Sequence, residues 1–421
     1  QTPNPKPQTP IPISPLHPKQ GYSRKIPILK MNVDPMAELS RIESTLRGEN
    51  DSLISIFTGT FVRDAMGQYL PGVTRIDYPD GSVYEGTTMN GLREGRGMMR
   101  YESGDVYLGD WAGDLFNGAG TYIFASGERY EGTLVNGKKH GKGVYRYLNG
   151  NFYSGDWADD QKNGRGVYEY RLTGERYEGE WSRGMKHGKG AFLFSYGDVF
   201  EGGFANGLKA GPGRLALASG TRVTGAWQND AAHGDCEAAF SNGDVFRGEL
   251  VRGRRQGFGT YAFRDGTVAE GEFRGDRFDG RAVVRYRNGD TFEGELRNGV
   301  KHGKGVYVYA NGDEYTGDFI ADQRHGNGVY LYKSSGDAYE GAWARDLKNG
   351  PGVYRHANGA KFEGNFTEGL KAGRGRFRWP TGEVFEGVWE RDMMNGKGVM
   401  TDSNGMVRNV RFAMNTLEEI E

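Results

Sequence analysis

Residues 302–343 read HGKGVYVYANGDEYTGDFIADQRHGNGVYLYKSSGDAYEGAW, and one pattern occurs in this stretch twice. Each copy contains Gly-x-Gly, two spaced aromatic residues, a turn, and then an aromatic residue followed by x-Gly. Self-similarity at a fixed period is typical of repeat architectures, in which each copy is one structural unit. The stretch therefore predicts that the fold is built from many copies of one small unit.

The repeat extends over most of the chain. If the aromatic residue before x-Gly is taken as position zero, it recurs in steps of 23 residues, and twice in steps of 24. We expect the array to span residues 57–412, with fourteen clear copies from residue 84 and degenerate first and last units. Position zero is occupied by Tyr84, Tyr107, Tyr130, Tyr153, Tyr177, Phe200, Val223, Phe246, Ala269, Phe292, Tyr315, Tyr339, Phe362 and Phe385.

Each copy has the alternation of β-strands. Aromatic residues and glycine alternate at Tyr153, Gly155 and Trp157, and again at Gly166 and Tyr168 after a polar loop. A period of two predicts strands, because successive side chains point to opposite faces of a sheet. Glycine inside a strand leaves room for a neighbouring group to approach the backbone. We therefore expect the rings to lie across the glycines and to form a ladder.

Asx-Gly pairs lie between the predicted strands. These pairs predict two-residue hairpin turns with positive φ. They are Asn149-Gly150, Asn242-Gly243, Asp265-Gly266, Asn288-Gly289 and Asn311-Gly312. One hairpin cannot bury its aromatic face alone, so the copies must stack edge to edge. The sequence predicts an all-β fold, an elongated single-sheet solenoid of about fifteen stacked β-hairpins.

The ends of the chain differ from the array. Residues 1–33 are rich in proline and predict an extended arm. Residues 34–48 predict a short capping helix, with Asp34 as N-cap, Pro35 in the first turn and Gly48 past the end. Residues 413–421 are expected to form a C-terminal tail. The chain begins at Gln1 rather than Met, which predicts that its start is trimmed.

Charge and cysteine content restrict the possible partners and compartment. Lys and Arg number 54 against 55 Asp and Glu, giving a net charge of -1, so no overall field favours nucleic acid. The single cysteine, Cys236, excludes an internal disulfide and a cysteine-rich metal site. The single cysteine favours a reducing compartment, and we expect the protein in the cytoplasm.

No catalytic motif stands out. The sequence lacks Gly-x4-Gly-Lys-Ser/Thr, His-Glu-x-x-His and Gly-x-Ser-x-Gly. A histidine recurs at one position of several copies, but neighbouring copies should lie about 9–10 Å apart, too far to share a metal. We expect no enzyme activity, no cofactor and no metal site.

Two sets of residues are candidates for binding. The first is an aromatic-glycine groove that we expect to hold protein partners. It comprises Tyr107, Trp111, Tyr130, Tyr153, Trp157, Tyr177, Trp181, Phe292, Tyr315, Tyr339, Trp343, Phe362 and Trp389. The second is a set of loop lysines that could contact anionic lipid or an acidic partner, although interleaved acidic residues also fit a solvated, balanced edge. It comprises Lys138, Lys139, Lys142, Lys186, Lys189, Lys301 and Lys304.

The unit YEGEWSRGMKHGKGAFLFSYGD, residues 177–198, resembles the MORN repeat. The resemblance covers roughly residues 57–412, and it implies stacked β-hairpins that act as a scaffold without catalysis. Residues 315–343 are similar to repeats of the radial spoke head MORN proteins of motile cilia, including their 24-residue step.

This resemblance implies a structural scaffold of the ciliary or flagellar axoneme, in the cytoskeleton, within the radial spoke head. Its partners would be other axonemal or spoke-head proteins, with homodimerisation through the end repeats as a further possibility and no role for nucleic acid. The alternative is a lipid-associated cytoskeletal scaffold at a membrane edge or basal body, which would bind membrane phospholipid.

Overall fold

The structure is a computed structural model that describes residues 48–50 and 62–420. The chain divides into two compact units, one of residues His17–Ala232 and one of residues Gln1–Leu16 with His233–Glu421, and each is described by itself. The predicted proline-rich arm, and the predicted helix except for Gly48, lie outside the described residues. Residues 48–50 are helical, so Gly48 lies within a helix and not past its end.

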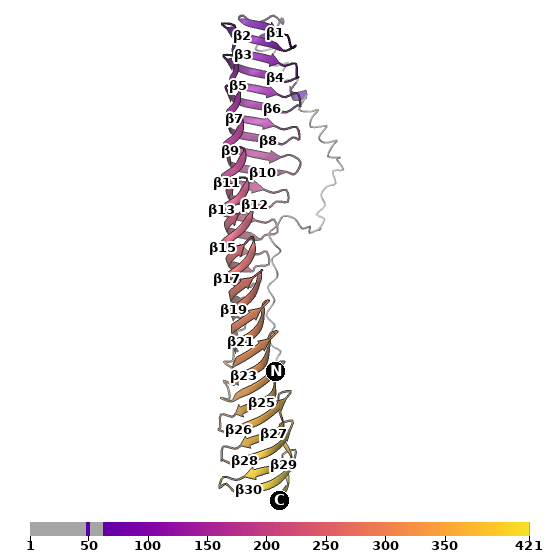
Figure 1. The fold of residues 1–421 in the computed structure, drawn as a ribbon, viewed down its shortest axis with the longest axis vertical. Helices are drawn as coiled ribbons and strands as arrows, with labels where there is room; N and C mark the ends of the chain where they lie inside the picture. The colour runs from indigo at the N-terminus through magenta and orange to yellow at the C-terminus, as the bar shows by residue number, and fades with distance from the viewer. Residues whose placement is uncertain (1–47, 51–61, 421) are drawn as a thin grey trace. The chain divides into compact units, whose positions relative to one another are not determined.

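In the described part of the first unit, consecutive strands form an open antiparallel sheet (Figure 1). The strands are β1 (Val73–Asp77), β2 (Val83–Met89), β3 (Leu92–Arg100), β4 (Val106–Ala112), β5 (Leu115–Ile123), β6 (Arg129–Val135), β7 (Lys138–Arg146), β8 (Phe152–Ala158), β9 (Gln161–Tyr170), β10 (Glu175–Ser182), β11 (Met185–Leu193), β12 (Val199–Ala205), β13 (Leu208–Ala216) and β14 (Arg222–Gln228).

Strand β15 (Ala231–Ala239) begins at the end of the first unit, and the second unit continues in the same way. Its strands are β16 (Val245–Val251), β17 (Arg254–Ala262), β18 (Val268–Arg274), β19 (Arg277–Arg285), β20 (Thr291–Arg297), β21 (Val300–Val308), β22 (Glu314–Ile320), β23 (Gln323–Leu331), β24 (Ala338–Ala344), β25 (Leu347–Arg355), β26 (Lys361–Thr367), β27 (Leu370–Arg378), β28 (Val384–Glu390), β29 (Met393–Thr401), β30 (Val407–Ala413) and β31 (Thr416–Ile420). The predicted all-β fold of stacked hairpins is confirmed in both units.

The register aligns the glycines of neighbouring strands. Within one copy Tyr153 faces Tyr168, Gly155 faces Gly166, and the register then shifts at a bulge after Gly155. The same Gly-to-Gly alignment joins one copy to the next, where Gly143 faces Gly155. A row that is mostly glycine therefore crosses the strands of each unit, with Cys236, Ala282 and Val410 at the same position in the second.

The turns differ from the sequence-based prediction. The two-residue hairpin turns lie between the strands of one copy, as at Asp159 and Asp160, whose φ angles are 45° and 68°. At the predicted site, Asn149-Gly150, only the glycine has a positive φ, 78°. There the Asn149 side chain instead accepts a hydrogen bond from the N–H of Asn151 at 3.0 Å. The prediction was wrong because an asparagine before glycine stabilises this longer connection as well.

The rings lie over the glycine row, as the sequence predicts. A Cβ on Gly166 would collide with the ring of Tyr153. The Tyr153 hydroxyl donates to the carbonyl of Asp156 at 2.8 Å. Its ring contacts Trp157 edge-on, with centroids 5.1 Å apart, and Trp181 of the next copy at 5.2 Å. We call this inward layer of rings the ring core.

Acidic side chains link one copy to the next. Asp290 accepts hydrogen bonds from the hydroxyl of Tyr307 at 2.6 Å and from the N–H of Ala310 at 2.8 Å. Asp160, in a hairpin turn, accepts from the N–H of Lys139 at 3.0 Å. Both arrangements recur along the chain, so each copy satisfies polar groups of its neighbour.

The C-terminal residues continue the array. Strand β31 pairs antiparallel with β30, and Val410 faces Ile420. The predicted tail of residues 413–421 is therefore wrong for Thr416–Ile420, which form the last strand. Among the described residues, no helix is long and apolar enough to span a bilayer.

Candidate functional site

The aromatic residues predicted to line a partner groove lie in the ring core. All thirteen are buried, and the exposed fraction of Tyr107, Tyr153 and Phe292 is 0%. The buried set is Tyr107, Trp111, Tyr130, Tyr153, Trp157, Tyr177, Trp181, Phe292, Tyr315, Tyr339, Trp343, Phe362 and Trp389. As folded, these side chains are packed against the chain itself, so a role in partner binding stays a prediction and other residues form the accessible surface.

The predicted lysines separate into two groups. Lys139, Lys186 and Lys301 extend over the ring core; the ammonium of Lys301 lies 4.6 Å from the ring centroid of Tyr307, and Lys301 is 2% exposed. Lys138, Lys142, Lys189 and Lys304 are exposed. A cation over a ring face is stabilised by the ring quadrupole, so the first group contributes to packing.

The ring-packed cations recur at one position of the repeat, nine residues after position zero. The sequence analysis missed this row, although ten copies place Lys or Arg there, because lysines were grouped by loop rather than by repeat position. Burial lowers the pKa of Lys162, Lys301 and Lys371 from their usual value. The row is Arg93, Lys139, Lys162, Lys186, Lys209, Arg255, Lys301, Arg324, Lys348 and Lys371.

Several exposed lysines are paired with acids. Lys142 lies 2.6 Å from Asp156, and Lys304 lies 2.6 Å from Asp318 across the strands. Exposed pairs of this kind contribute little stability, roughly 0–1 kcal/mol. The pairing agrees with a balanced edge, and contact with anionic lipid stays a prediction.

The face opposite the ring core is accessible and regular. Along strands β18 to β24, one row of outward side chains alternates between valine and a polar residue, with direct cross-strand partners at each step. The row runs Glu270, Val283, Glu293, Val306, Thr316, Val329 and Glu340. The glycine row runs beside it, with Ala282 in place of glycine on β19.

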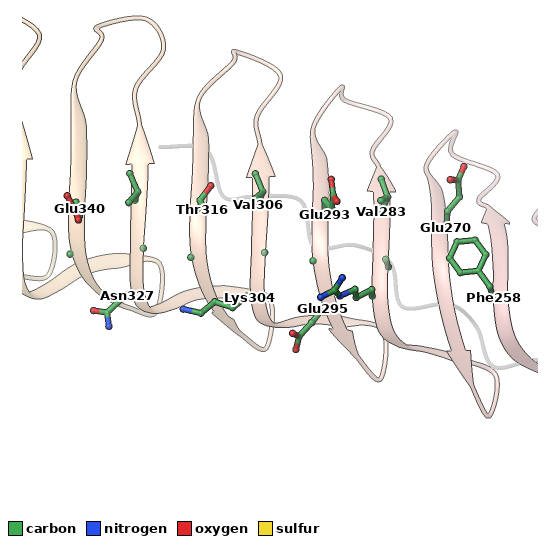
Figure 2. A pocket seen from close by; sticks show the side chains of 18 residues that line it. Phe258, Glu270, Val283, Glu293, Glu295, Lys304, Val306, Thr316, Asn327 and Glu340 are labelled. Atoms are coloured by element: carbon green, nitrogen blue, oxygen red, sulfur yellow. The ribbon is translucent and has the colours of Figure 1, made fainter.

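This face is hollowed into a groove of about 820 Å³, which we call the 258–341 groove. Figure 2 shows Val283, Val306 and Thr316 along one side and Lys304 and Asn327 along the other. At one end lies Phe258, which is 67% exposed. The groove thus combines a row in which valines alternate with polar side chains, a floor of mostly glycine backbone and one exposed ring, a composition suited to binding a peptide.

A similar hollow lies in the first unit. The 142–190 groove has a volume of about 700 Å³ and is lined by Val144 and Val167 with the glycine row. The two grooves differ in charge. Four glutamates (Glu270, Glu293, Glu295, Glu340) stand against Arg281 and Lys304 in the 258–341 groove, whereas Glu178 and Glu180 stand against Lys142, Arg165 and Lys189 in the other. The two linings therefore differ in their ratio of acidic to basic side chains.

A family model for the MORN repeat matches the chain thirteen times. The matches cover more than half of the chain, at residues 84–106, 107–129, 130–152, 153–171, 177–199, 200–222, 246–268, 270–291, 292–314, 315–336, 339–361, 362–384 and 385–407. The chain belongs to the MORN-repeat family. The matches leave out residues 223–245, the copy that carries Val223 at position zero.

As a MORN-repeat protein, the chain is a repeat scaffold for protein or membrane interaction. Such proteins are typically non-catalytic, and no catalytic family is indicated. Among the described residues, no group of three or more His, Cys, Asp and Glu side chains is arranged to hold a metal ion. The accessible grooves, rather than a reaction centre, are the candidate functional sites of this MORN-repeat chain.

Comparison with solved structures finds weak likenesses only. The TCP10 domain of CPAP from Danio rerio, in complex with a peptide of STIL, is 15% identical with a TM-score of 0.33, covering 50% of this chain and 94% of that chain. The TCP10c domain of Sas-4 from Drosophila melanogaster is 14% identical with a TM-score of 0.24, covering 37% of this chain and 93% of that chain. Likenesses of this size do not indicate a shared role with this MORN-repeat protein. A search of curated proteins finds no match.

Proposed function

We propose that this chain is a non-catalytic scaffold of the ciliary or flagellar axoneme that holds partner proteins at fixed spacing, as a component of the radial spoke head. The observation that carries the scaffold role is the separation of the two faces: one face is filled by the ring core, and the opposite face stays accessible with a regular array of side chains. The axonemal part of the proposal rests on the sequence resemblance of residues 315–343 to spoke-head repeats alone.

Spacing is the property that such a scaffold supplies. Equivalent outward positions recur once per copy, two strands apart, at about 9.5 Å. Because neighbouring copies are joined by buried hydrogen bonds such as Tyr307 to Asp290, the positions of bound partners are fixed relative to one another within a unit.

The test is to extract cilia or flagella with detergent and to follow the full-length chain. We expect it to remain with the axoneme and to form chemical cross-links to spoke-head proteins. Recovery in the detergent-soluble fraction, or cross-links to membrane proteins alone, would exclude the axonemal role.

A second candidate is a lipid-associated cytoskeletal scaffold. The observation that favours it is the 142–190 groove, whose lining holds Lys142, Arg165 and Lys189 against two glutamates, with Lys142 paired to Asp156. Flotation with vesicles that contain phosphoinositide tests it: the full chain should float at low salt, and a Lys142→Glu, Lys189→Glu variant should not. Sedimentation of the wild type without the vesicles would exclude it.

A further inference from the structure

The 258–341 groove runs across the strands rather than along them. Its lining comes from strands β17 to β24, and strands β18 to β24 are paired on both sides. An occupant therefore cannot add to the sheet as another strand. It must lie on the outward face and contact the side chains that project there.

The apolar positions of the groove have a fixed spacing. Val283, Val306 and Val329 lie on β19, β21 and β23, so each is two strands from the next. Two strand spacings amount to about 9.5 Å. A polyproline II helix has three residues per turn and rises about 9.3 Å per turn. A peptide in this conformation would present one residue to each valine at every third position.

The chain contains such a peptide. Pro12, Pro15 and Pro18 recur at every third residue, within an arm where proline favours the polyproline II conformation. Three residues at this spacing extend over about 19 Å, and three valines two strands apart extend over about the same distance. The arm and the groove therefore have matching periods.

Charge also matches. The arm carries five cations and no Asp or Glu; they are Lys6, Lys19, Arg24, Lys25 and Lys30. Of the four glutamates that line the groove, Glu270 is paired with Arg285 and Glu340 with Arg355. The negative charge that faces an occupant therefore comes mainly from Glu293 and Glu295, two residues apart on β20. Complementary charge of this kind steers association and fixes the register of a bound segment.

We propose that the 258–341 groove is the docking site for the proline-rich arm, residues 1–33, of this chain. The arm lies in the groove as a polyproline II helix, with Pro12, Pro15 and Pro18 over the three valines and its lysines toward the glutamates. The inference does not depend on the axonemal role, because both the groove and its occupant belong to the chain.

The experiment uses the full-length chain with the photoreactive residue p-benzoylphenylalanine in place of Leu16. After irradiation, cross-linked peptides are identified by mass spectrometry. We expect the cross-links to fall on residues 258–341, and the yield to drop when Pro12, Pro15 and Pro18 are all replaced by Ala. Absence of cross-links, or cross-links mainly elsewhere, would overturn the proposal.

Two matched variants control for folding. Val306→Lys places a cation inside the groove, and Val353→Lys places one at the equivalent position of β25, outside the lining. Arg214 and Arg376 already occupy this repeat position in other copies, so the fold accepts a cation there. We expect Val306→Lys to lower the yield at least about fivefold and Val353→Lys to leave it unchanged. Equal yields in both variants would contradict docking in this groove.

Discussion

The ring of Tyr153 lies directly over Gly166, in the space that a Cβ on that glycine would occupy. The two residues come from neighbouring strands of one copy, β8 and β9, and the same contact recurs along the chain, as between Tyr315 and Gly328. Glycine is required here by the ring rather than by the backbone, because Gly166 does not have a positive φ. The contact explains why glycine and aromatic residues occur together in every regular copy.

Replacing Gly166 by alanine should destabilise the chain. The added methyl group must push the Tyr153 ring off the sheet, and overpacking of this kind costs about 1–3 kcal/mol. Urea denaturation followed by circular dichroism measures the change. Ser154→Ala, on the outward face of β8, serves as the control and should change the free energy of unfolding by no more than about 0.5 kcal/mol.

Removal of the Asp290 carboxylate should weaken the link between two copies. Asp290→Ala leaves the buried hydroxyl of Tyr307 and the N–H of Ala310 without this acceptor, at a cost of about 1–3 kcal/mol. Asp290→Asn keeps one acceptor oxygen and should cost less, since Asn151 occupies the equivalent position of another copy. Equal denaturation midpoints for both variants would contradict a hydrogen-bonding role.

The turn residue Asp160 adopts a positive φ and also links its copy to the preceding one, and substitutions can separate these two roles. Its φ is 68° and its carboxylate accepts from the N–H of Lys139. Asp160→Gly should lose this hydrogen bond and the 3.3 Å ion pair with the Lys139 ammonium, together about 1 kcal/mol, without backbone strain. Gly137 and Gly184 occupy the same turn position elsewhere. Asp160→Ala should lose roughly another 1 kcal/mol through backbone strain. Faster hydrogen exchange at the Lys139 amide should accompany both variants.

Alkaline pH should unfold the array. Burial raises the pKa of Tyr107, Tyr153 and Tyr339 above their usual value near 10. A raised folded-state pKa gives stability that is present below the unfolded value, about pH 10, and is lost as the pH rises through the folded value. The lowered pKa of lysines such as Lys301 has the opposite effect on the stability of the fold. Because the folded state loses this proton at a lower pH than the unfolded state does, the lysines favour folding more as the pH rises toward the usual lysine pKa.

The tyrosines outnumber the buried lysines, so we expect loss of circular dichroism together with the appearance of tyrosinate absorbance, both above about pH 10. If the buried tyrosines titrated near pH 10 while the chain stayed folded, the account of the ring core would be wrong.

The fold could be predicted because the decisive residues repeat. Tyr153, Gly155 and Trp157 alternate with period two, and fourteen copies of that pattern leave little choice but stacked hairpins. The turn type was predicted wrongly, since Asn149-Gly150 favours two kinds of connection and only backbone geometry distinguishes them.

The candidate site was harder to predict from sequence. Period two places Tyr153 and Ser154 on opposite faces, but it does not say which face is packed and which is accessible. The same limit applies to Lys301 and Lys304: both are loop lysines in the sequence, yet the first lies among rings and the second faces solvent. They are three residues apart, so alternation places them on opposite faces, but the alternation does not say which of the two lies among the rings.

The most direct test of the separation of faces is lysine-specific cross-linking of the full-length chain in its native assembly. The test compares the reactivity of Lys301, on the ring-core face, with that of Lys304, on the opposite face. The side chain of Lys304 is 73% exposed, whereas Lys301 is 2% exposed. The account predicts cross-links to partner proteins from Lys304, and from Lys142 and Lys189, with Lys301 unmodified. Partner cross-links from Lys301 would contradict it, because they would mean that the ring core, not the opposite face, is open to binding.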